Sequence, residues 1–187
     1  MSGGAILIAF IVLALIGAAV LYNQLVKRRQ LATNGWADID VQLKRRSDLI
    51  PHLVETVKGY ATHERALFED VVAKRNQAGE AGDDPGRRGA AESALSQPVA
   101  KLVAVAEDYP DLKANENFLK LQTELSDTET KIEMARRFYN GATRELNIAV
   151  KSFPVNLLAG LFGFSARAYF EIDVASTHSP DIDFGDS

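Results

Sequence analysis

Two stretches of this chain place apolar residues at alternating steps of three and four positions. Such an alternation, kept without a slip, is typical of helices that pack side by side along an apolar seam. The sequence therefore predicts an all-α protein with an antiparallel bundle of long helices. The seam positions are Trp36, Ile39, Leu43, Arg46, Ile50, Leu53, Val57 and Tyr60 in the first stretch, and Phe118, Leu121, Leu125, Thr128, Ile132, Ala135, Tyr139, Ala142, Leu146, Ala149 and Phe153 in the second.

Prolines predict where these helices begin, bend and end. Pro51 lies inside the first seam, but the alternation continues through it, so we interpret Pro51 as a kink in one long helix. A turn at Pro51 would give four helices instead. The second long helix is expected to begin near Pro110 and Asp111, which suit a first helical turn, and to end at Pro154.

Shorter elements are expected between and after the seams. Residues 77–89 are rich in glycine and acidic residues, which predicts a loop. A shorter helix is expected over residues 90–106. After the second seam, Asn156 is expected to cap a short apolar helix over residues 157–162. No stretch has the period-two alternation of an amphipathic strand.

The N-terminal region predicts a membrane anchor. No charged residue occurs from Met1 to Val26, and the apolar run begins at Ala5. About 20 apolar residues in a helix cross the hydrocarbon core of a bilayer, so the length fits. A cleaved signal peptide is the alternative, but such peptides carry positive charge before their apolar core. Here the positive charge follows the core, which favours a retained transmembrane helix over residues 5–26.

The charge bias around this helix predicts its orientation. Residues 1–4 form a short segment without Lys or Arg, whereas basic residues follow the helix closely. Because positively charged flanks stay on the cytoplasmic side, we expect the N-terminus outside and the body in the cytoplasm. The body is expected to be a helical bundle domain over residues 27–170. Residues 171–187 are expected to be a disordered tail.

Composition narrows the chemistry that the chain can perform. The 187 residues carry a formal net charge of −4 and no cysteine, so thiol nucleophiles, disulfides and zinc-thiolate sites are excluded. The tail from Glu171 onward contains five acidic and no basic residues, so it contributes −5 and the remainder +1. A near-neutral body lacks the basic stripe that is usual in nucleic-acid-binding domains, and no nucleic acid is expected as a partner.

No catalytic, cofactor or metal site is expected. Di-metal sites in helical bundles use Glu-x-x-His pairs, and no glutamate stands three residues before His52, His63 or His178. His52 and His63 would lie roughly 16 Å apart along one helix, too far to share a metal. The glycines at 77–89 lack the Gly-Lys-Ser/Thr ending of a phosphate-binding loop.

The basic residues near the anchor are the candidate contacts with a partner or with lipid headgroups. These residues are Lys27, Arg28, Arg29, Arg45 and Arg46. Arg46 stands in an apolar seam, and an isolated buried charge is costly. We therefore favour an ion pair between Arg46 and a glutamate of the second helix, and the alternative is a partner or headgroup contact. The acids within reach are Glu124, Glu129 and Glu133.

Several motifs resemble the LemA family. They include residues 21–26 directly after the anchor, residues 36–60 with Asp48-Leu49-Ile50-Pro51, and residues 109–115 with Tyr109-Pro110-Asp111. Phe118, Tyr139-Asn140 and Phe153-Pro154 continue the resemblance, which covers about residues 21–170. The resemblance implies a single-pass protein of the bacterial cytoplasmic membrane. It supplies no catalytic residues, and it implies no established activity.

Three functions remain open at this point. We favour a membrane-anchored interaction or scaffold protein of the cell envelope, without catalytic activity or cofactor. The alternatives are a lipid-binding or membrane-organising protein and an enzyme with an unrecognised carboxylate site. Expected partners are the bilayer through residues 5–26, an unknown membrane or envelope protein, and a second copy packed through small anchor residues such as Gly17. The apolar element at 157–162 is expected to cap the bundle, or alternatively to contact a partner or membrane.

Overall fold

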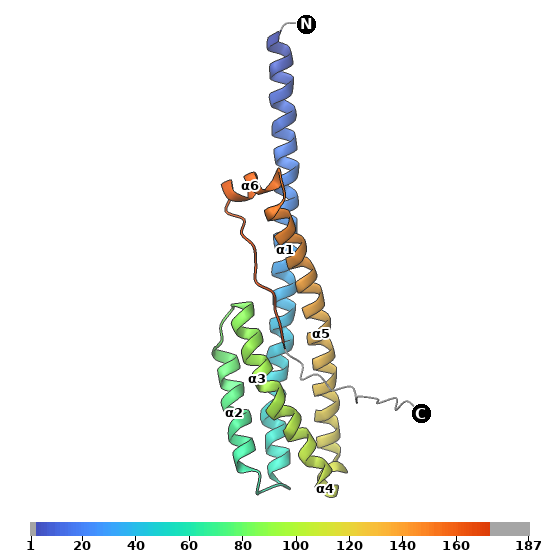
Figure 1. Ribbon diagram of the computed structural model, residues 1–187. Coiled ribbons are helices and arrows are strands. Elements are labelled where there is room, and N and C mark those ends of the chain that lie inside the picture. Colours follow the sequence, from blue (N-terminus) through green and yellow to red (C-terminus); the bar gives the residue numbers. More distant parts are fainter. Residues whose placement is uncertain (1–2, 173–187) are drawn as a thin grey trace, which may run out of the picture. The chain divides into compact units, whose positions relative to one another are not determined.

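The protein is built from helices, and the all-α prediction is confirmed (Figure 1). A computed structural model describes residues 3–172. No strand occurs in this part of the chain. The helices are α1 (Gly3–Lys58), α2 (Arg65–Glu80), α3 (Pro85–Ala104), a 3-10 turn η1 (Val105–Glu107), α4 (Pro110–Lys113), α5 (Glu116–Lys151) and α6 (Val155–Leu161).

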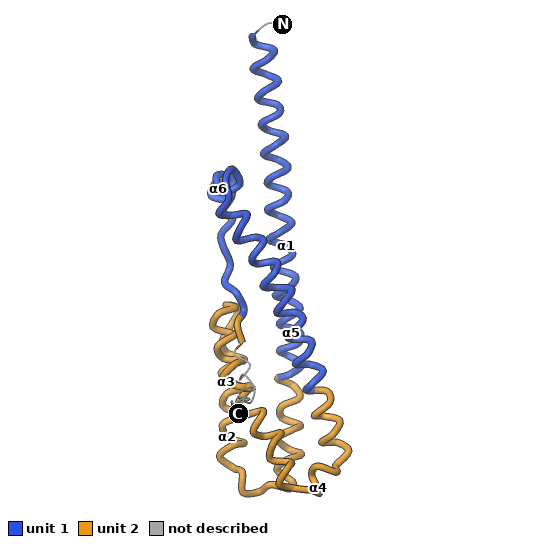
Figure 2. Tube along the Cα trace, turned by 45° about the vertical axis from the view of Figure 1, so that its right-hand side comes forward, with its two compact units in different colours: residues 1–46, 125–170 blue, residues 47–124, 171–187 orange. Residues whose placement is uncertain are grey.

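The helices are divided between two compact units (Figure 2). Unit 1 comprises residues 1–46 and 125–170, and unit 2 comprises residues 47–124 and 171–187. The long helices α1 and α5 each contribute to both units. The tail from residue 173 onward, which the sequence predicts to be disordered, lies outside the described residues.

Unit 1 is an antiparallel pair of helices, α1 and α5, with α6 beside them. The predicted seams form its core. Ile39 and Leu43 of α1 are buried, as are Ile132, Tyr139 and Leu146 of α5. The Trp36 and Tyr139 ring centroids lie 5.6 Å apart, with the two ring planes tilted relative to each other. The seam ends before Phe153, which is 80% exposed, because α5 stops at Lys151.

Helices α1 and α5 come close together at Gly35, which has no side chain to separate them. A Cβ on Gly35 of α1 would lie 2.9 Å from Phe138 Cδ1 and 3.1 Å from Tyr139 Cα on α5. A glycine therefore lets the backbones of α1 and α5 approach at this level. The approach keeps Phe138 at the border of the seam.

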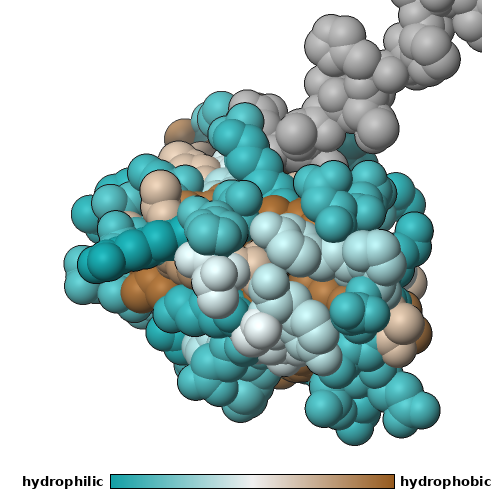
Figure 3. Space-filling view, turned by 90° about the horizontal axis from the view of Figure 1, so that it is seen from below, coloured by the Kyte–Doolittle hydropathy of each residue, from teal (hydrophilic) through white to brown (hydrophobic). Residues whose placement is uncertain are grey.

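Unit 2 packs α2 against α3, together with the end of α1 and the start of α5. Its core includes Leu53 and Val57 of α1, Phe68 of α2 and Leu102 of α3. At the end of unit 2 nearest the viewer in Figure 3, hydrophilic residues cover most of the surface. This end of the unit thus has the polar surface that is normal for a bundle in water.

A second glycine allows a close approach in unit 2. A Cβ on Gly89 of α3 would lie 2.2 Å from the backbone oxygen of Glu171. The chain after unit 1 therefore crosses α3 at a position that tolerates no side chain.

The single-helix interpretation of Pro51 is confirmed, because α1 continues through it to Lys58. The predicted loop over residues 77–89 is wrong in extent. Helix α2 continues to Glu80, and α3 already begins at Pro85. The Asp84 side chain accepts a hydrogen bond from the backbone N–H of Arg87 and caps α3, with proline in its first turn. These capping signals outweigh the unfavourable helix propensity of the glycines that follow.

The starts of the last two helices, α5 and α6, also differ from the expectation. Pro110 begins the short helix α4, and the long helix α5 begins only at Glu116. The side chain of Asn115 accepts a hydrogen bond from the backbone N–H of Phe118 at 3.1 Å. Asn156 does not cap α6, because α6 begins at Val155 and the capping residue is Pro154.

The first part of α1 is long and apolar enough to cross a membrane. Its large side chains from Ile6 to Val20 are about half or more exposed, and its most apolar stretch is not buried within the protein. A core helix of a soluble bundle would bury such side chains. The N-terminal helix therefore fits a single-pass membrane protein.

Candidate functional site

Lys27, Arg28 and Arg29, the basic residues that directly follow the anchor, differ in how far other residues of the protein bind them. Arg28 Nη1 donates a 2.9 Å hydrogen bond to the backbone oxygen of Glu145, and lies 3.3 Å from its carboxylate. The Arg29 guanidinium lies 4.7 Å from the ring centroid of Phe164. Lys27 is exposed. Of these three candidates, Lys27 and Arg29 leave the most charge accessible to solvent.

The short helix α6 packs beside the same part of α1 (Figure 1). Tyr22 of α1 contacts Phe162 and Phe164, with ring centroids 4.9 and 5.8 Å apart. Ala159 and Phe164 are buried against Leu25 and Ala149. This element thus covers one end of the α1–α5 core, as the capping interpretation expects. Leu157, Leu161 and Phe162, however, remain exposed.

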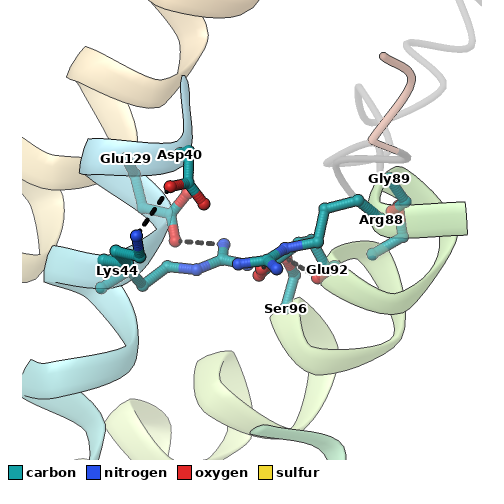
Figure 4. Close-up of polar contacts among 9 residues, drawn as sticks. Asp40, Lys44, Arg88, Gly89, Glu92, Ser96 and Glu129 are labelled. Carbon is teal, nitrogen blue, oxygen red and sulfur yellow. Dashed lines mark hydrogen bonds and ion pairs between the residues drawn. The ribbon is translucent and has the colours of Figure 1, made fainter. Parts of the chain in front are cut away.

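Arg46 lies in the core, where the apolar seam predicts it. It is 1% exposed, and its Nη1 lies 2.7 Å from Glu129 Oε1. The prediction of an ion pair with a glutamate of the second long helix is confirmed. Two residues earlier on α1, Lys44 pairs with Asp40 at 2.9 Å, and both residues appear with Glu129 in Figure 4. Arg45 is exposed.

Unit 2 has its own buried ion pair. Arg88 Nε lies 3.0 Å from Glu92 Oε1 within α3, and Glu92 is 3% exposed. Figure 4 shows Arg88 and Glu92, both of which project from α3. An intrahelical pair of this kind neutralises a carboxylate that would be costly to bury alone. The pair was not foreseen from the sequence, because the region was expected to be a loop up to residue 89.

Unit 2 also has an open groove of about 790 Å³ beside α2. Its lining includes Lys58, Phe68 and the Arg65–Glu69 pair. The hydrogen bond from Arg65 to the Glu69 carboxylate raises the pKa of the arginine. Two-carboxylate catalytic sites place the two acids in different environments, which push their pKa values apart. Glu69 is the acid of this groove's lining, and it is engaged by Arg65.

No metal site is formed by the described residues, since no three His, Cys, Asp or Glu side chains gather there. His52 and His63 are both exposed. His178 lies outside the described residues.

Two asparagines of α5 hold the extended segment 165–170, and sequence reasoning missed this role. Asn140 donates to the backbone oxygen of Phe170 and accepts from its N–H, both at 2.9 Å. Asn147 does the same for Arg167, at 2.9 and 2.8 Å. The available signal was their spacing of seven residues, which puts both on one face of a helix. We refer to Asn140 and Asn147 as the asparagine clamps.

A different face of α5 exposes apolar side chains. Met134 is 62% exposed and Phe138 49% exposed, and they lie one helical turn apart. Leu31, which is 41% exposed, lies one turn before Gly35 on α1, the residue that Phe138 touches. We refer to Leu31, Met134 and Phe138 as the Phe138 face. Single exposed apolar residues are common, but adjacent ones on neighbouring helices are typical of contact surfaces.

Comparison with known proteins places this architecture in a family. The model of the LemA family matches residues 35–184. The chain is 25% identical over 175 residues to Magnetosome protein MamQ 2 of Paramagnetospirillum magneticum, covering 80% of this chain and 64% of the relative. It is likewise 25% identical over 174 residues to Magnetosome protein MamQ of Magnetospirillum gryphiswaldense, with the same coverage.

A further relative carries the family's name. Protein LemA of Metamycoplasma hominis is 25% identical over 137 residues, covering 73% of this chain and 63% of the relative. The chain thus spans less than two thirds of the length of these curated relatives. Since the family model covers most of the chain, including the α1–α5 seam and both asparagine clamps, the protein belongs to the LemA family.

Proposed function

We propose that this protein is a membrane-tethered, non-catalytic interaction module of the bacterial envelope that binds a partner protein through the Phe138 face. The apolar start of α1 supplies the tether. The observation that carries the proposal is the exposure of Met134 and Phe138, which lie outside the seam of α5 and do not contribute to its buried face. Aromatic residues and methionine are enriched at protein interfaces.

The geometry also favours a protein partner over a small ligand. Small-molecule sites are concave and enclose most of their ligand, whereas the Phe138 face lies on the outside of two packed helices. A helix or helical hairpin of a partner could lay its own apolar side chains across Met134 and Phe138. Gly35 contributes because its lack of a side chain leaves room for the edge of the Phe138 ring against α1.

Photocrosslinking in living cells tests this proposal. A benzophenone side chain at Met134 is expected to give a discrete crosslinked band, because the probe replaces an exposed side chain within the contact. The same probe at Arg144, an exposed position on another face of α5, is the matched control. A band of twice the protein's mass would identify a second copy as the partner.

The crosslink must depend on the face itself. Replacing Phe138 with serine is expected to abolish the Met134 crosslink while the helix content and melting temperature stay close to those of the unsubstituted protein, since Phe138 is half exposed. The proposal fails if the Met134 and Arg144 probes give the same pattern, or if Phe138→Ser leaves the crosslink unchanged.

We further propose that the N-terminus faces the outside and that both units lie in the cytoplasm, at the inner membrane. The basic residues that follow the anchor, beginning with Lys27, support this orientation. The absence of cysteine permits a direct measurement. With single cysteines at Ser2 or Lys131, a membrane-impermeant maleimide is expected to label Ser2→Cys in intact spheroplasts, and Lys131→Cys only after lysis.

The opposite labelling pattern would reverse this orientation. If Lys131→Cys reacts before lysis and Ser2→Cys does not, the units face the outside. The search for a partner then moves to the extracytoplasmic side. Lys131 suits this measurement because it is exposed.

A further inference from the structure

The geometry points to a second membrane contact: we propose that α6 lies in the headgroup region of the bilayer, with Leu157, Leu161 and Phe162 inserted into lipid. The inference uses only the membrane tether of the proposed function and does not depend on the Phe138 face. It rests on the way α6 is packed, on its position along α1, and on its charge pattern.

Helix α6 leaves several large apolar side chains exposed. It buries Ala159 and partly buries Val155 and Leu158. Leu157 is 65% exposed, Leu161 76%, and Phe162 at the end of the helix 52%. A helix that only caps a core would turn its large apolar side chains toward the core. Phe153, in the turn before α6, is 80% exposed as well. These four exposed side chains lie at the end of α5, beside the part of α1 that follows the anchor (Figure 2).

The position of α6 along the anchor matches the edge of the hydrocarbon. Counted from Ala5, the anchor reaches Tyr22 after about 27 Å of helix, close to the thickness of a bilayer core of about 30 Å. Tyrosine side chains prefer this boundary. The Tyr22 ring lies 4.9 Å from that of Phe162. The exposed residues of α6 therefore stand at the depth at which the anchor leaves the lipid.

The charges around α6 fit the same location. No charged residue occurs from Ser152 to Ala166, and Lys151 and Arg167 stand at the two ends of this stretch. Arg29 of α1 lies against Phe164 at the side of the element. An uncharged apolar segment with cationic flanks is the pattern of interfacial elements, which bury their apolar face some 5–10 Å into the headgroup boundary. The exposed apolar surface of the anchor also continues into that of α6, which favours lipid over a protein partner.

Nitroxide labels on the full chain test the proposal. Single cysteines at Leu161, at Lys131 as an aqueous control and at Leu13 as an intramembrane control receive the label, and each protein is reconstituted into vesicles of phosphatidylcholine and phosphatidylglycerol. The collision rates with oxygen, which concentrates in lipid, and with a water-soluble nickel chelate are then compared. At Leu161 we expect a severalfold higher oxygen-to-nickel ratio than at Lys131, with a value between those of the two controls.

The outcomes distinguish insertion of α6 into lipid from three alternatives: an α6 exposed to water, an anchor that does not span the membrane, and an α6 covered by a second copy. A water-like label at Leu161 together with a buried label at Leu13 would overturn the contact of α6 and leave the tether intact. A water-like label at Leu13 would overturn both. A protected label at Leu161 that becomes water-like when the protein is diluted in lipid would show that a second copy covers α6. Leu157→Cys repeats the measurement on the same face, should the label at Leu161 disturb folding.

Discussion

Replacing both asparagine clamps with alanine is expected to lower the free energy of unfolding of the detergent-solubilised protein by about 4 kcal/mol, at about 1 kcal/mol for each hydrogen bond lost. The four bonds join Asn140 to Phe170 and Asn147 to Arg167. Each amide pairs with the backbone N–H and C=O of one residue, as a neighbouring strand would do. Without them, the segment after α6 has few ways to satisfy its backbone polar groups.

The segment itself should report the change before the whole protein does. Hydrogen exchange at the backbone N–H groups of Arg167 and Phe170 is expected to accelerate strongly in the double variant, because local opening no longer breaks the clamp bonds. Urea unfolding followed by circular dichroism measures the global effect. The buried ring of Phe170 makes an edge-to-face contact with Trp36, with ring centroids 5.5 Å apart. This contact couples the segment to the seam, so release of the segment also weakens the seam.

A matched control separates the clamps from ordinary asparagine substitutions. Asn117 is an exposed asparagine on the same helix, and Asn117→Ala is expected to change stability by less than about 0.5 kcal/mol. Equal effects of Asn117→Ala and of either clamp variant would contradict the role assigned to Asn140 and Asn147. The single variants should each show about half of the double variant's loss, because their bonds go to different residues.

Glu129→Ala is expected to destabilise the protein by about 2 kcal/mol, whereas Arg46→Met should leave stability within about 1 kcal/mol of the original. The asymmetry follows from burial. Arg46 is almost fully buried and Glu129 is 46% exposed. Removing the glutamate weakens the compensation of a charge that water cannot reach. Removing the arginine frees a carboxylate that can be hydrated, and methionine fills much of the vacated space.

Chemical unfolding of the single and double variants measures this coupling. The double variant Arg46→Met/Glu129→Ala should resemble Arg46→Met alone, which corresponds to an interaction energy of about 2 kcal/mol. Glu133→Ala is the matched control, since it removes the partner of Arg137 in an exposed pair on the same helix and should cost less than about 0.5 kcal/mol. If Glu129→Ala is as mild as Glu133→Ala, the buried pair is not important for stability.

Local and periodic features were readable from the sequence. The three-four alternation identified the seams of α1 and α5 because a buried helix face imposes its period on the chain. Because the alternation continues through Pro51, it also predicted that α1 is one helix on both sides of this proline. The uncharged start of α1 indicated a membrane-spanning helix because length and apolarity alone satisfy that requirement. A charge in an apolar seam required a partner, and three glutamates were within reach.

The three-dimensional arrangement decided the rest. Periodicity could not choose Glu129 from the three candidate glutamates, because the choice depends on the register between α1 and α5. By composition, Gly86 and Gly89 predicted a loop, but both lie in α3, which Asp84 caps. The Glu171 backbone passes so close to Gly89 that a side chain there would clash with it.

The same limit applied to the clamps and to α6. Asparagine carries no apolar signal, so only the folded chain reveals which backbone Asn140 binds. An apolar helix such as α6 is predicted from sequence to turn inward, because sequence alone cannot say what surrounds it. In the fold, Ala159 packs against Leu25 of α1, and Leu157 and Leu161 of α6 remain exposed.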